Sequence, residues 1–266
     1  MDGAVNSHTT VLIKIGGRAM EDETALVDLL RELAELFDNT DMRFLLVHGG
    51  GAEVSRISKI MGMEPVFKDG KRITSPEEMP VIEMVLSGSI NKKIVRLANT
   101  CGLVAVGISG ADASLFTASA LSEDTRTGMI DFVNNSIVEN LLSLGYFPVI
   151  SPCSVDSHGN ALNINADDAA LALARSMSVD ALVFISDIPG ILKEDKVLTR
   201  LSASSVEKEI ASGTISGGMI PKVRASVEAL KSGVSHIVIS NYINKGDFAS
   251  LMEGKKGTTL SLEADL

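Results

Sequence analysis

The stretch Val11-Leu12-Ile13-Lys14-Ile15-Gly16-Gly17 sets the class of fold that this chain can adopt. A short apolar run that ends in glycines is typical of a buried parallel strand. A lysine inside such a strand is costly to bury, so we expect Lys14 near the carboxyl end of the strand, opening into a site. The other interpretation is a lysine that only reaches solvent at a strand edge. Gly16 and Gly17 let the backbone pass close to a bulky group.

Strand-like and helix-like runs alternate along most of the chain, which predicts an α/β fold with a mainly parallel sheet and helices on both faces. The other expected strands are 43–47, 103–108, 146–151, 181–185 and 236–239, with a last extended piece at 257–260 and hairpins at 65–74 and 115–133. The expected helices are 21–37, 52–61, one from Ser75 that ends near Gly88, 91–100, 136–144, 168–177, 202–211, 221–231 and 247–252. In such a sheet the site lies at the carboxyl ends of the strands.

The composition excludes several classes of function. The 266 residues are 45% hydrophobic, enough for one large α/β domain or two small lobes. The net charge of −10 and the absence of a basic run argue against nucleic acid or an anionic membrane as a partner. No segment has the signal-peptide pattern or the roughly 18 apolar residues of a membrane span, so we expect a soluble cytoplasmic protein. Cys101 and Cys153 are expected as free thiols, and the four histidines form no metal-ligand pattern.

Three glycines follow the strand at 43–47 and open a helix. Unpaired N–H groups of Gly49, Gly50 and Gly51, together with the helix dipole, favour an anion there. A tight turn that requires positive φ is the structural alternative. The motif is neither a P-loop nor GxGxxG, so nucleotide binding has to rest on other residues.

Arg72 and the segment 163–167 are further candidates. Arg72 follows Asp-Gly-Lys, where a guanidinium suits bidentate capture of a carboxylate, although a solvated arginine on a hairpin fits equally well. If residues 163–165 are extended, Asn163 and Asn165 point the same way. Asp167 or Asp168 then suits the N-cap of the next helix, which leaves one of the two acids for another task.

Lys222 lies in the first turn of a helix that follows two glycines. A cation at a helix N-terminus opposes the dipole, so this placement is locally unfavourable. We therefore expect Lys222 to be functional or to pair with an acid such as Asp167. A solvated lysine is the alternative.

Six motifs in order resemble the amino acid kinase family, and the resemblance covers residues 9–260, nearly the whole chain. The motifs are VLIKIGG at 11–17, HGGG at 48–51, GKRIT at 70–74, NINAD at 163–167, SDIPGIL at 186–192 and SGGMIPK at 216–222. The resemblance implies a three-layer αβα sandwich around a mainly parallel sheet of about eight strands. It also implies one continuous domain in which lobe 1–178 binds an acyl amino acid and makes a homodimer, while lobe 179–266 binds ATP.

The motifs are most similar to those of family members that use ATP, with Mg²⁺ on its phosphates, to phosphorylate the side-chain carboxylate of N-acetyl-L-glutamate in arginine biosynthesis. By this resemblance Lys14 and Lys222 flank the transferring phosphoryl group, and Asp167 orients both lysines. The acyl amino acid would contact Gly49, Gly50, Gly51, Arg72, Asn163 and Asn165. The phosphoryl group and ATP would contact Gly16, Gly17, Ser186, Asp187, Gly190, Gly218 and Met219. No direct protein ligand to the metal is implied.

Two segments depart from the family pattern. Residues 109–114 contain fewer glycines than usual, and Ser240-Asn241-Tyr242 stands where an aspartate–glycine pair is common, which affects the expected ATP contacts. Only about ten residues precede the first strand, whereas arginine-inhibited members carry an extra N-terminal helix that links dimers into hexamers. The expectation is a homodimer that arginine does not inhibit by that route.

Two alternative functions stay open at this point. One is a kinase for a related acylated amino dicarboxylate, such as the carrier-bound 2-aminoadipate of lysine biosynthesis, although the net charge of −10 suits an acidic carrier poorly. The other is a non-catalytic sensor of amino acids or nucleotides with the same fold. The joint presence of Lys14, Asp167 and Lys222 disfavours a sensor.

Overall fold

A central sheet of eight strands organises the fold in the computed structural model, which describes residues 8–68 and 70–263. Its strands are, in order across the sheet, β14 (Arg200–Ser202), β16 (Thr258–Ser261), β15 (His236–Ser240), β11 (Ala181–Ile185), β1 (Thr9–Ile15), β2 (Met42–His48), β8 (Phe147–Ser151) and β5 (Ala105–Ser109). Neighbouring strands are parallel except for β15 and β16. The predicted, mainly parallel sheet is therefore confirmed.

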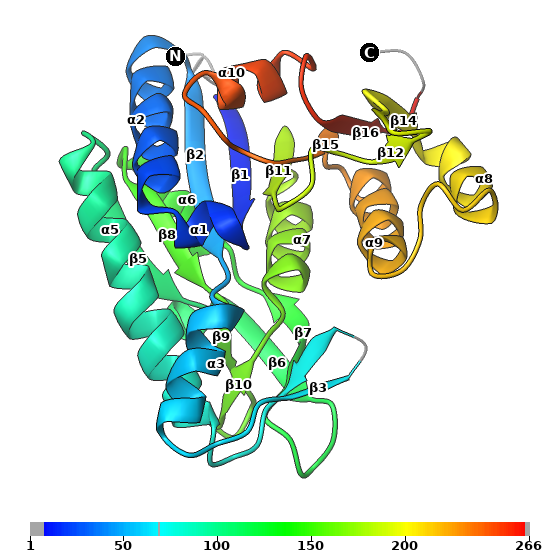
Figure 1. Ribbon diagram of the computed structural model, residues 1–266. Helices are drawn as coiled ribbons and strands as arrows, with labels where there is room; N and C mark the ends of the chain where they lie inside the picture. The colour runs from blue at the N-terminus through cyan, green and yellow to red at the C-terminus, as the bar shows by residue number, and fades with distance from the viewer. Residues whose placement is uncertain (1–7, 69, 264–266) are drawn as a thin grey trace, which may run out of the picture.

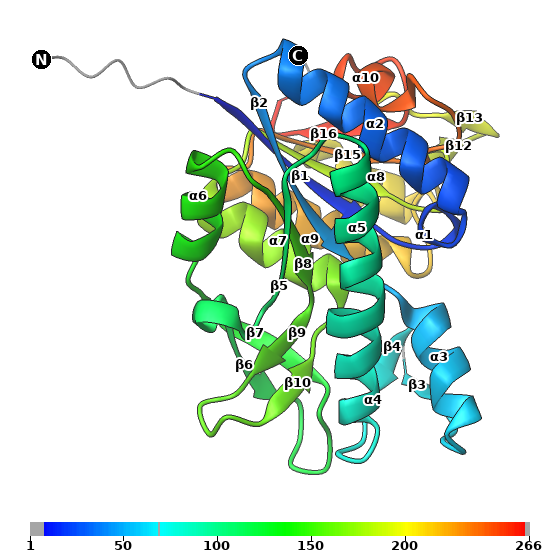
Figure 2. The ribbon, with the colours of Figure 1, turned by 90° about the vertical axis from the view of Figure 1, so that its left-hand side faces the viewer.

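Helices cover both faces of this sheet and make the three layers of an αβα sandwich (Figures 1 and 2). One face carries α2 (Glu23–Asn39), α5 (Asn91–Thr100) and α10 (Asp247–Met252). The other carries α6 (Ser136–Ser143), α7 (Ala166–Met177) and α9 (Met219–Lys231). No helix of the described chain is long and apolar enough to cross a membrane.

Strand β1 shows how the sequence places Lys14. Side chains of a strand alternate between the two faces of the sheet. Val11, Ile13 and Ile15 are fully buried in the core on the α2 side, whereas Leu12 is fully buried in the core on the α7 side. Lys14 follows Leu12 in this alternation, so it lies on the α7 face at the carboxyl end of the strand.

Smaller β structures lie beyond the carboxyl ends of β2 and β8 (Figure 1, lower part). A four-stranded sheet has the order β10 (Ala161–Asn163), β9 (Cys153–Val155), β6 (Phe116–Ala120) and β7 (Gly128–Val133), and a hairpin joins β3 (Val66–Lys68) to β4 (Lys71–Ile73). Both predicted hairpins are confirmed, although Asp69 at the tip of the second lies outside the described residues. Strands β9 and β10 were not predicted, because three residues are too few to show a period.

The predicted helix end near Gly88 is wrong. Helix α4 (Met79–Glu83) continues through a π-helical segment, η1 (Met84–Ile90), directly into α5. Val85, Leu86 and Ile90 are buried within the core, so tertiary packing outweighs the low helix propensity of glycine. The wider π-helical turns change the direction of the side chains that follow.

The remaining elements connect this frame, and the core runs through both proposed lobes. They are α1 (Arg18–Glu21), α3 (Gly51–Ile60), β12 (Leu192–Lys193), β13 (Lys196–Val197), α8 (Val206–Ala211) and the short 3₁₀ turns Asp112–Ser114 and Ala203–Ser205. Each apolar core mixes residues from before and after position 178; Ile13 and Val183, for example, share one core and Leu12 and Phe184 the other. The packing is therefore continuous across that position.

Candidate active site

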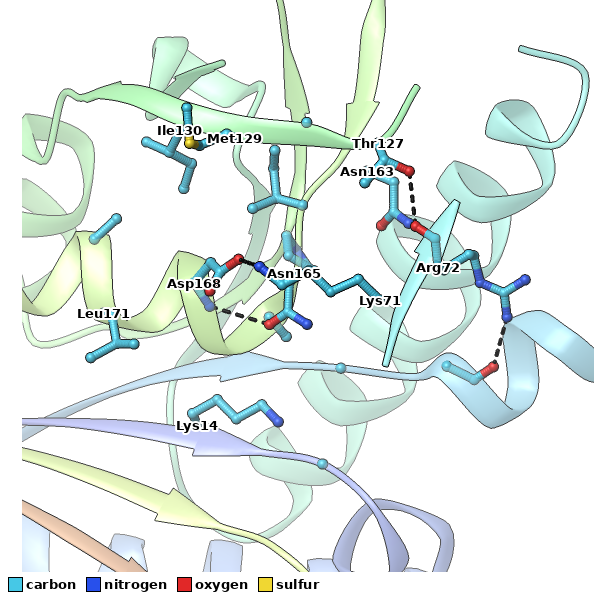
Figure 3. Close-up of a pocket in the computed structure, with 18 of the residues that line it drawn as sticks. Lys14, Lys71, Arg72, Thr127, Met129, Ile130, Asn163, Asn165, Asp168 and Leu171 are labelled. Atoms are coloured by element: carbon cyan, nitrogen blue, oxygen red, sulfur yellow. Dashed lines mark hydrogen bonds and ion pairs between the residues drawn. The ribbon is translucent and has the colours of Figure 1, made fainter. Parts of the chain in front are cut away.

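A cavity of about 720 Å³ opens at the carboxyl ends of β1 and β2, between the central sheet and the smaller β structures (Figure 3). It gathers predicted residues from distant parts of the sequence. Those in its lining are Lys14, Gly16, Gly17, Gly49, Gly50, Gly51, Arg72, Asn163 and Asn165. Apolar side chains, including Phe67, Leu121, Met129, Ile130 and Leu171, form other parts of the wall.

One carboxylate holds two lysines beside this cavity. The Nζ of Lys14 lies 2.8 Å from one oxygen of Asp167, and the Nζ of Lys222 lies 3.0 Å from the other. The Lys14, Lys222 and Asp167 side chains are 13%, 16% and 23% exposed, so the group is largely shielded from water. The Lys222 ammonium also lies 5.0 Å from the centre of the Phe184 ring. The predicted pairing of Lys222 with Asp167 is confirmed.

The local structure explains why Asp167 is available for this pairing. Asn165, not Asp167 or Asp168, caps α7: its side-chain oxygen accepts hydrogen bonds from the N–H groups of Asp167 and Asp168. Burial by itself would raise the pKa of Asp167, but the charges of Lys14 and Lys222 hold that pKa below its usual value. The carboxylate is therefore ionised at neutral pH and keeps both ammonium groups in place.

Glycines bring the backbone close to the same place. Gly17 has a φ of 58°, and a Cβ there would lie 2.4 Å from a carboxylate oxygen of Asp187, so a side chain does not fit. The N–H of Gly49 donates to the carbonyl oxygen of Ile15, so it is not a donor to a ligand as expected. Gly50 and Gly51 begin α3, and the first N–H groups of a helix have no partner within it.

Arg72 is buried beside the cavity and is not the solvated hairpin arginine of the alternative interpretation. It is 9% exposed. Its guanidinium donates to Glu78 at 2.7 Å, to the Ser55 hydroxyl at 2.5 Å and to the Gly51 carbonyl at 3.2 Å, and it stacks over the Phe67 ring. Glu78 was not predicted as a site residue, because in the sequence it is only one of two acids near a helix start.

The two asparagines and the β3–β4 hairpin close the wall opposite Lys14 (Figure 3). The Asn163 amide donates to the Thr74 hydroxyl at 2.9 Å, and the Asn165 side chain caps α7. Lys71 of the hairpin forms a 2.6 Å ion pair with Asp168. Both side chains of this pair are about half exposed, so it contributes little to stability.

Of the residues predicted to contact the phosphoryl group and ATP, Gly16 and Gly17 are in the lining of this cavity, whereas Ser186, Asp187, Gly190, Gly218 and Met219 are not. Ser186 and Asp187 follow β11, and Gly218 and Met219 begin α9 directly before Lys222. Gly190 has a φ of 142°, and a Cβ there would lie 2.8 Å from side-chain atoms of Val197 and Thr258. Local packing therefore accounts for a glycine at this position. No group of three histidine, cysteine or acidic side chains within 8–68 and 70–263 is placed to hold a metal ion.

The segment that departs from the family pattern is built into the core. The Ser240 carbonyl accepts from the Ser186 N–H at 2.8 Å. Tyr242 is 4% exposed and its hydroxyl donates to the buried Glu32 at 3.0 Å. Burial and the Glu32 charge raise the pKa of Tyr242. The departure therefore ties the end of β15 to helix α2.

His48, the last residue of β2, lies directly beneath the glycine turn and is fully buried. Its Nδ1 lies 2.9 Å from the Gly49 carbonyl oxygen and its Nε2 lies 3.2 Å from the amide nitrogen of Asn91. Burial lowers the pKa of His48 from 6.5 to about 4, and Lys92 adds to the decrease. His48 is therefore neutral at pH 7.

We expect the free energy of unfolding to fall between pH 6.5 and pH 4. In that window the unfolded chain protonates His48 and the folded chain does not, so stability rises with pH, by up to about 3 kcal/mol from this residue. Urea unfolding of wild type and His48→Asn at pH 5 and pH 7 measures the effect. The variant should lose less stability at pH 5, and equal losses in the two proteins would contradict the prediction.

Comparison with known proteins identifies the family of this chain. A model of the amino acid kinase family matches residues 9–241. An acetylglutamate kinase from Kosmotoga olearia is 39% identical over 238 residues, covering 87% of this chain and 83% of that protein. One from Bacillus licheniformis is 39% identical over 248 residues, covering 90% and 94%.

A solved structure supports the fold alone. The N-acetylglutamate synthase of Neisseria gonorrhoeae, complexed with coenzyme A and N-acetyl-glutamate, has a TM-score of 0.82 at 21% identity. The match covers 97% of this chain and 60% of that one. By the family model and the curated relatives, this chain belongs to the amino acid kinase family.

Proposed function

We propose that this chain is an acetylglutamate kinase: it transfers the γ-phosphoryl group of ATP to the side-chain carboxylate of N-acetyl-L-glutamate, in arginine biosynthesis. The identity to acetylglutamate kinases over most of both chains supports this substrate. The observation that carries the chemistry is the Asp167 carboxylate that holds Lys14 and Lys222 at the edge of the cavity.

The reaction joins two anions and needs charge neutralisation more than a covalent nucleophile. An oxygen of the substrate carboxylate attacks the γ-phosphorus. As that O–P bond forms, the bond from the γ-phosphorus to the β,γ-bridging oxygen breaks, and ADP leaves with the electron pair. The products are N-acetyl-L-glutamyl 5-phosphate and ADP. Positive charge at the phosphoryl oxygens and at the leaving oxygen therefore lowers the barrier.

The positions of the charged groups suggest a separate role for each lysine in the transfer. Lys14, in the cavity wall, neutralises the phosphoryl oxygens, and Lys222, at the start of α9, faces the leaving ADP oxygen. Asp167 keeps the two ammonium groups at a fixed separation. The N–H groups of Gly17, Gly50 and Gly51 donate to oxygens of the phosphoryl group and the substrate carboxylate.

The substrate and the nucleotide approach from opposite lobes in this proposal. Arg72, Asn163 and Asn165 hold the acyl amino acid within lobe 1–178. ATP binds lobe 179–266 through Gly218, Met219 and the residues that follow β11. Magnesium enters on the ATP phosphates, since the Asp167 carboxylate is already occupied by two ammonium groups and is a poor ligand for a further cation. We further propose a cytoplasmic homodimer, in which β5, at one edge of the central sheet, is an available contact.

A hydroxamate assay tests the function. Purified protein with Mg·ATP, N-acetyl-L-glutamate and hydroxylamine should give an acyl hydroxamate, because hydroxylamine traps the acyl phosphate. Omitting the acyl amino acid should abolish the signal, and carrier-bound 2-aminoadipate should give a much lower rate. ATP binding without hydroxamate from acetylglutamate would refute the proposal.

A further inference from the structure

The glycine turn Gly49–Gly51 rests on a buried polar network whose hydrogen-bond directions can be assigned. Asn91, the first residue of α5, places its amide nitrogen 2.9 Å from the Val149 carbonyl and 3.3 Å from the Ile108 carbonyl. Its amide oxygen accepts from the Lys92 ammonium at 3.1 Å. The amide nitrogen therefore faces His48, and a nitrogen of this kind only donates.

The two neighbours of the ring decide the tautomer of His48. The Gly49 carbonyl oxygen beside Nδ1 can only accept, so the proton of the neutral ring lies on Nδ1 and the lone pair of Nε2 faces the Asn91 amide nitrogen. Nδ1 then donates to the Gly49 carbonyl oxygen at 2.9 Å. Both ring nitrogens are used inside the protein, and His48 is not in the cavity lining.

The hydrogen bond to Gly49 also sets the direction of the next N–H group. The carbonyl of Gly49 and the N–H of Gly50 belong to one peptide unit, and no peptide bond in the described chain is cis. In a planar trans peptide these two groups point in opposite directions. A carbonyl held toward the buried ring of His48 thus turns the Gly50 N–H away from the ring.

The π-helical segment η1 contacts the same turn through side chains. A Cβ at Gly50 would lie 2.3 Å from Cδ1 of Ile90 and 2.8 Å from Cδ2 of Leu86. The segment ends directly before Asn91. The glycine turn therefore packs against the side chains of η1, and the residue after η1, Asn91, lies next to His48. A Cβ at Gly107 of strand β5 would lie 2.0 Å from the Asn91 amide oxygen, which explains a glycine in that strand.

We propose that His48 and Asn91 are positioning residues of the kinase: through the Gly49 carbonyl they aim the Gly50 N–H at the reacting oxygens, with η1 as the rigid support. The proposal rests on the proposed function. Neither side chain touches the substrate. Their effect is on the chemical step, because a misdirected donor weakens charge stabilisation in the transition state more than it weakens binding of ATP.

Two substitutions separate the roles of the ring nitrogens. His48→Asn places an amide N–H where Nδ1 stood and keeps the donor to Gly49, whereas His48→Gln reaches only the position of Nε2 and loses it. We expect His48→Asn to stay within about fivefold of the wild-type kcat, and His48→Gln to lose about 10²-fold with an unchanged KM for ATP. Equal kcat values for the two variants would refute the proposal.

A measurement on the wild-type protein is independent of activity and of how the variants fold. With ¹⁵N-labelled histidine, NMR at pH 7 should show one neutral ring protonated at Nδ1, and its signals should vanish in His48→Asn. If the ring whose signals vanish in His48→Asn is protonated at Nε2 or is charged, the assigned network is overturned. If the tautomer is as expected but the wild type does not phosphorylate acetylglutamate, the proposed function fails and the network stands.

Discussion

Replacing Lys14 by alanine is expected to lower the kcat for acetylglutamate phosphorylation by about 10²- to 10³-fold in a protein that still folds. The Nζ of Lys14 lies in the cavity wall, 2.8 Å from Asp167. Its removal takes away a positive charge that stabilises the transition state, while Asp167 keeps its second partner, Lys222. Steady-state kinetics with saturating Mg·ATP and thermal unfolding measure the two effects.

Lys59→Ala is the matched control for this variant. Lys59 is an exposed lysine on α3, so its loss changes the net charge by the same amount without touching the cavity. It should leave kcat within about twofold, since surface substitutions of this kind are nearly neutral. If Lys14→Ala retains the kcat of Lys59→Ala, Lys14 does not have the role proposed for it.

Asp167→Asn is expected to abolish measurable turnover and to destabilise the protein. The amide cannot neutralise Lys14 and Lys222, so two shielded ammonium groups repel each other and lose their alignment. Breaking a buried ion pair by removing one partner costs about 3–5 kcal/mol, and the 13–23% exposure of these side chains places the loss near the lower end. We expect kcat to fall by at least about 10³-fold.

The next residue supplies the control for Asp167→Asn. Asp168 lies in the same helical turn and also pairs with a lysine, Lys71, but that pair is about half exposed. Asp168→Asn should therefore change the free energy of unfolding by no more than about 1 kcal/mol. Although Asp168 lines the cavity, it pairs with neither Lys14 nor Lys222, so its replacement should lower kcat far less than Asp167→Asn. Hydroxamate assays and urea unfolding of both variants make the comparison. Similar losses in the two variants would show that Asp167 has no special place in the site.

The order of elements and the class of fold could be predicted from the sequence, because their causes are local. Apolar strands and amphipathic helices are recognised by the spacing of their apolar residues, and turns by their glycines. The pattern of β1 even assigns Lys14 to one face of the sheet. The helix end predicted near Gly88 was wrong because burial of Val85, Leu86 and Ile90 is a tertiary effect.

The sequence predicted the pairing of Lys222 with Asp167 and several residues of the cavity lining, but Ser186, Asp187, Gly190, Gly218 and Met219 lie outside that lining. Lys14, Asp167 and Lys222 come from three distant segments, and their pairing required only that charge and dipole be satisfied. The burial of Arg72 by Glu78 could not be predicted, since nothing in the local sequence distinguishes a buried acid from a solvated one. Asn91 was not predicted either, because its burial depends on segments that are distant in the sequence.

By itself, then, the sequence determined the strand–helix alternation, the glycine turns and the residues that could carry charge chemistry. Tertiary structure alone decided that Arg72 is buried against Glu78, that a π-helix continues through Gly88 and that His48 supports the Gly49 carbonyl. The physical reason is how far apart along the sequence the interacting residues lie. Local conformation follows from neighbouring residues, whereas hydrogen bonds and ion pairs between distant segments exist only once the packed sheet has brought those segments together.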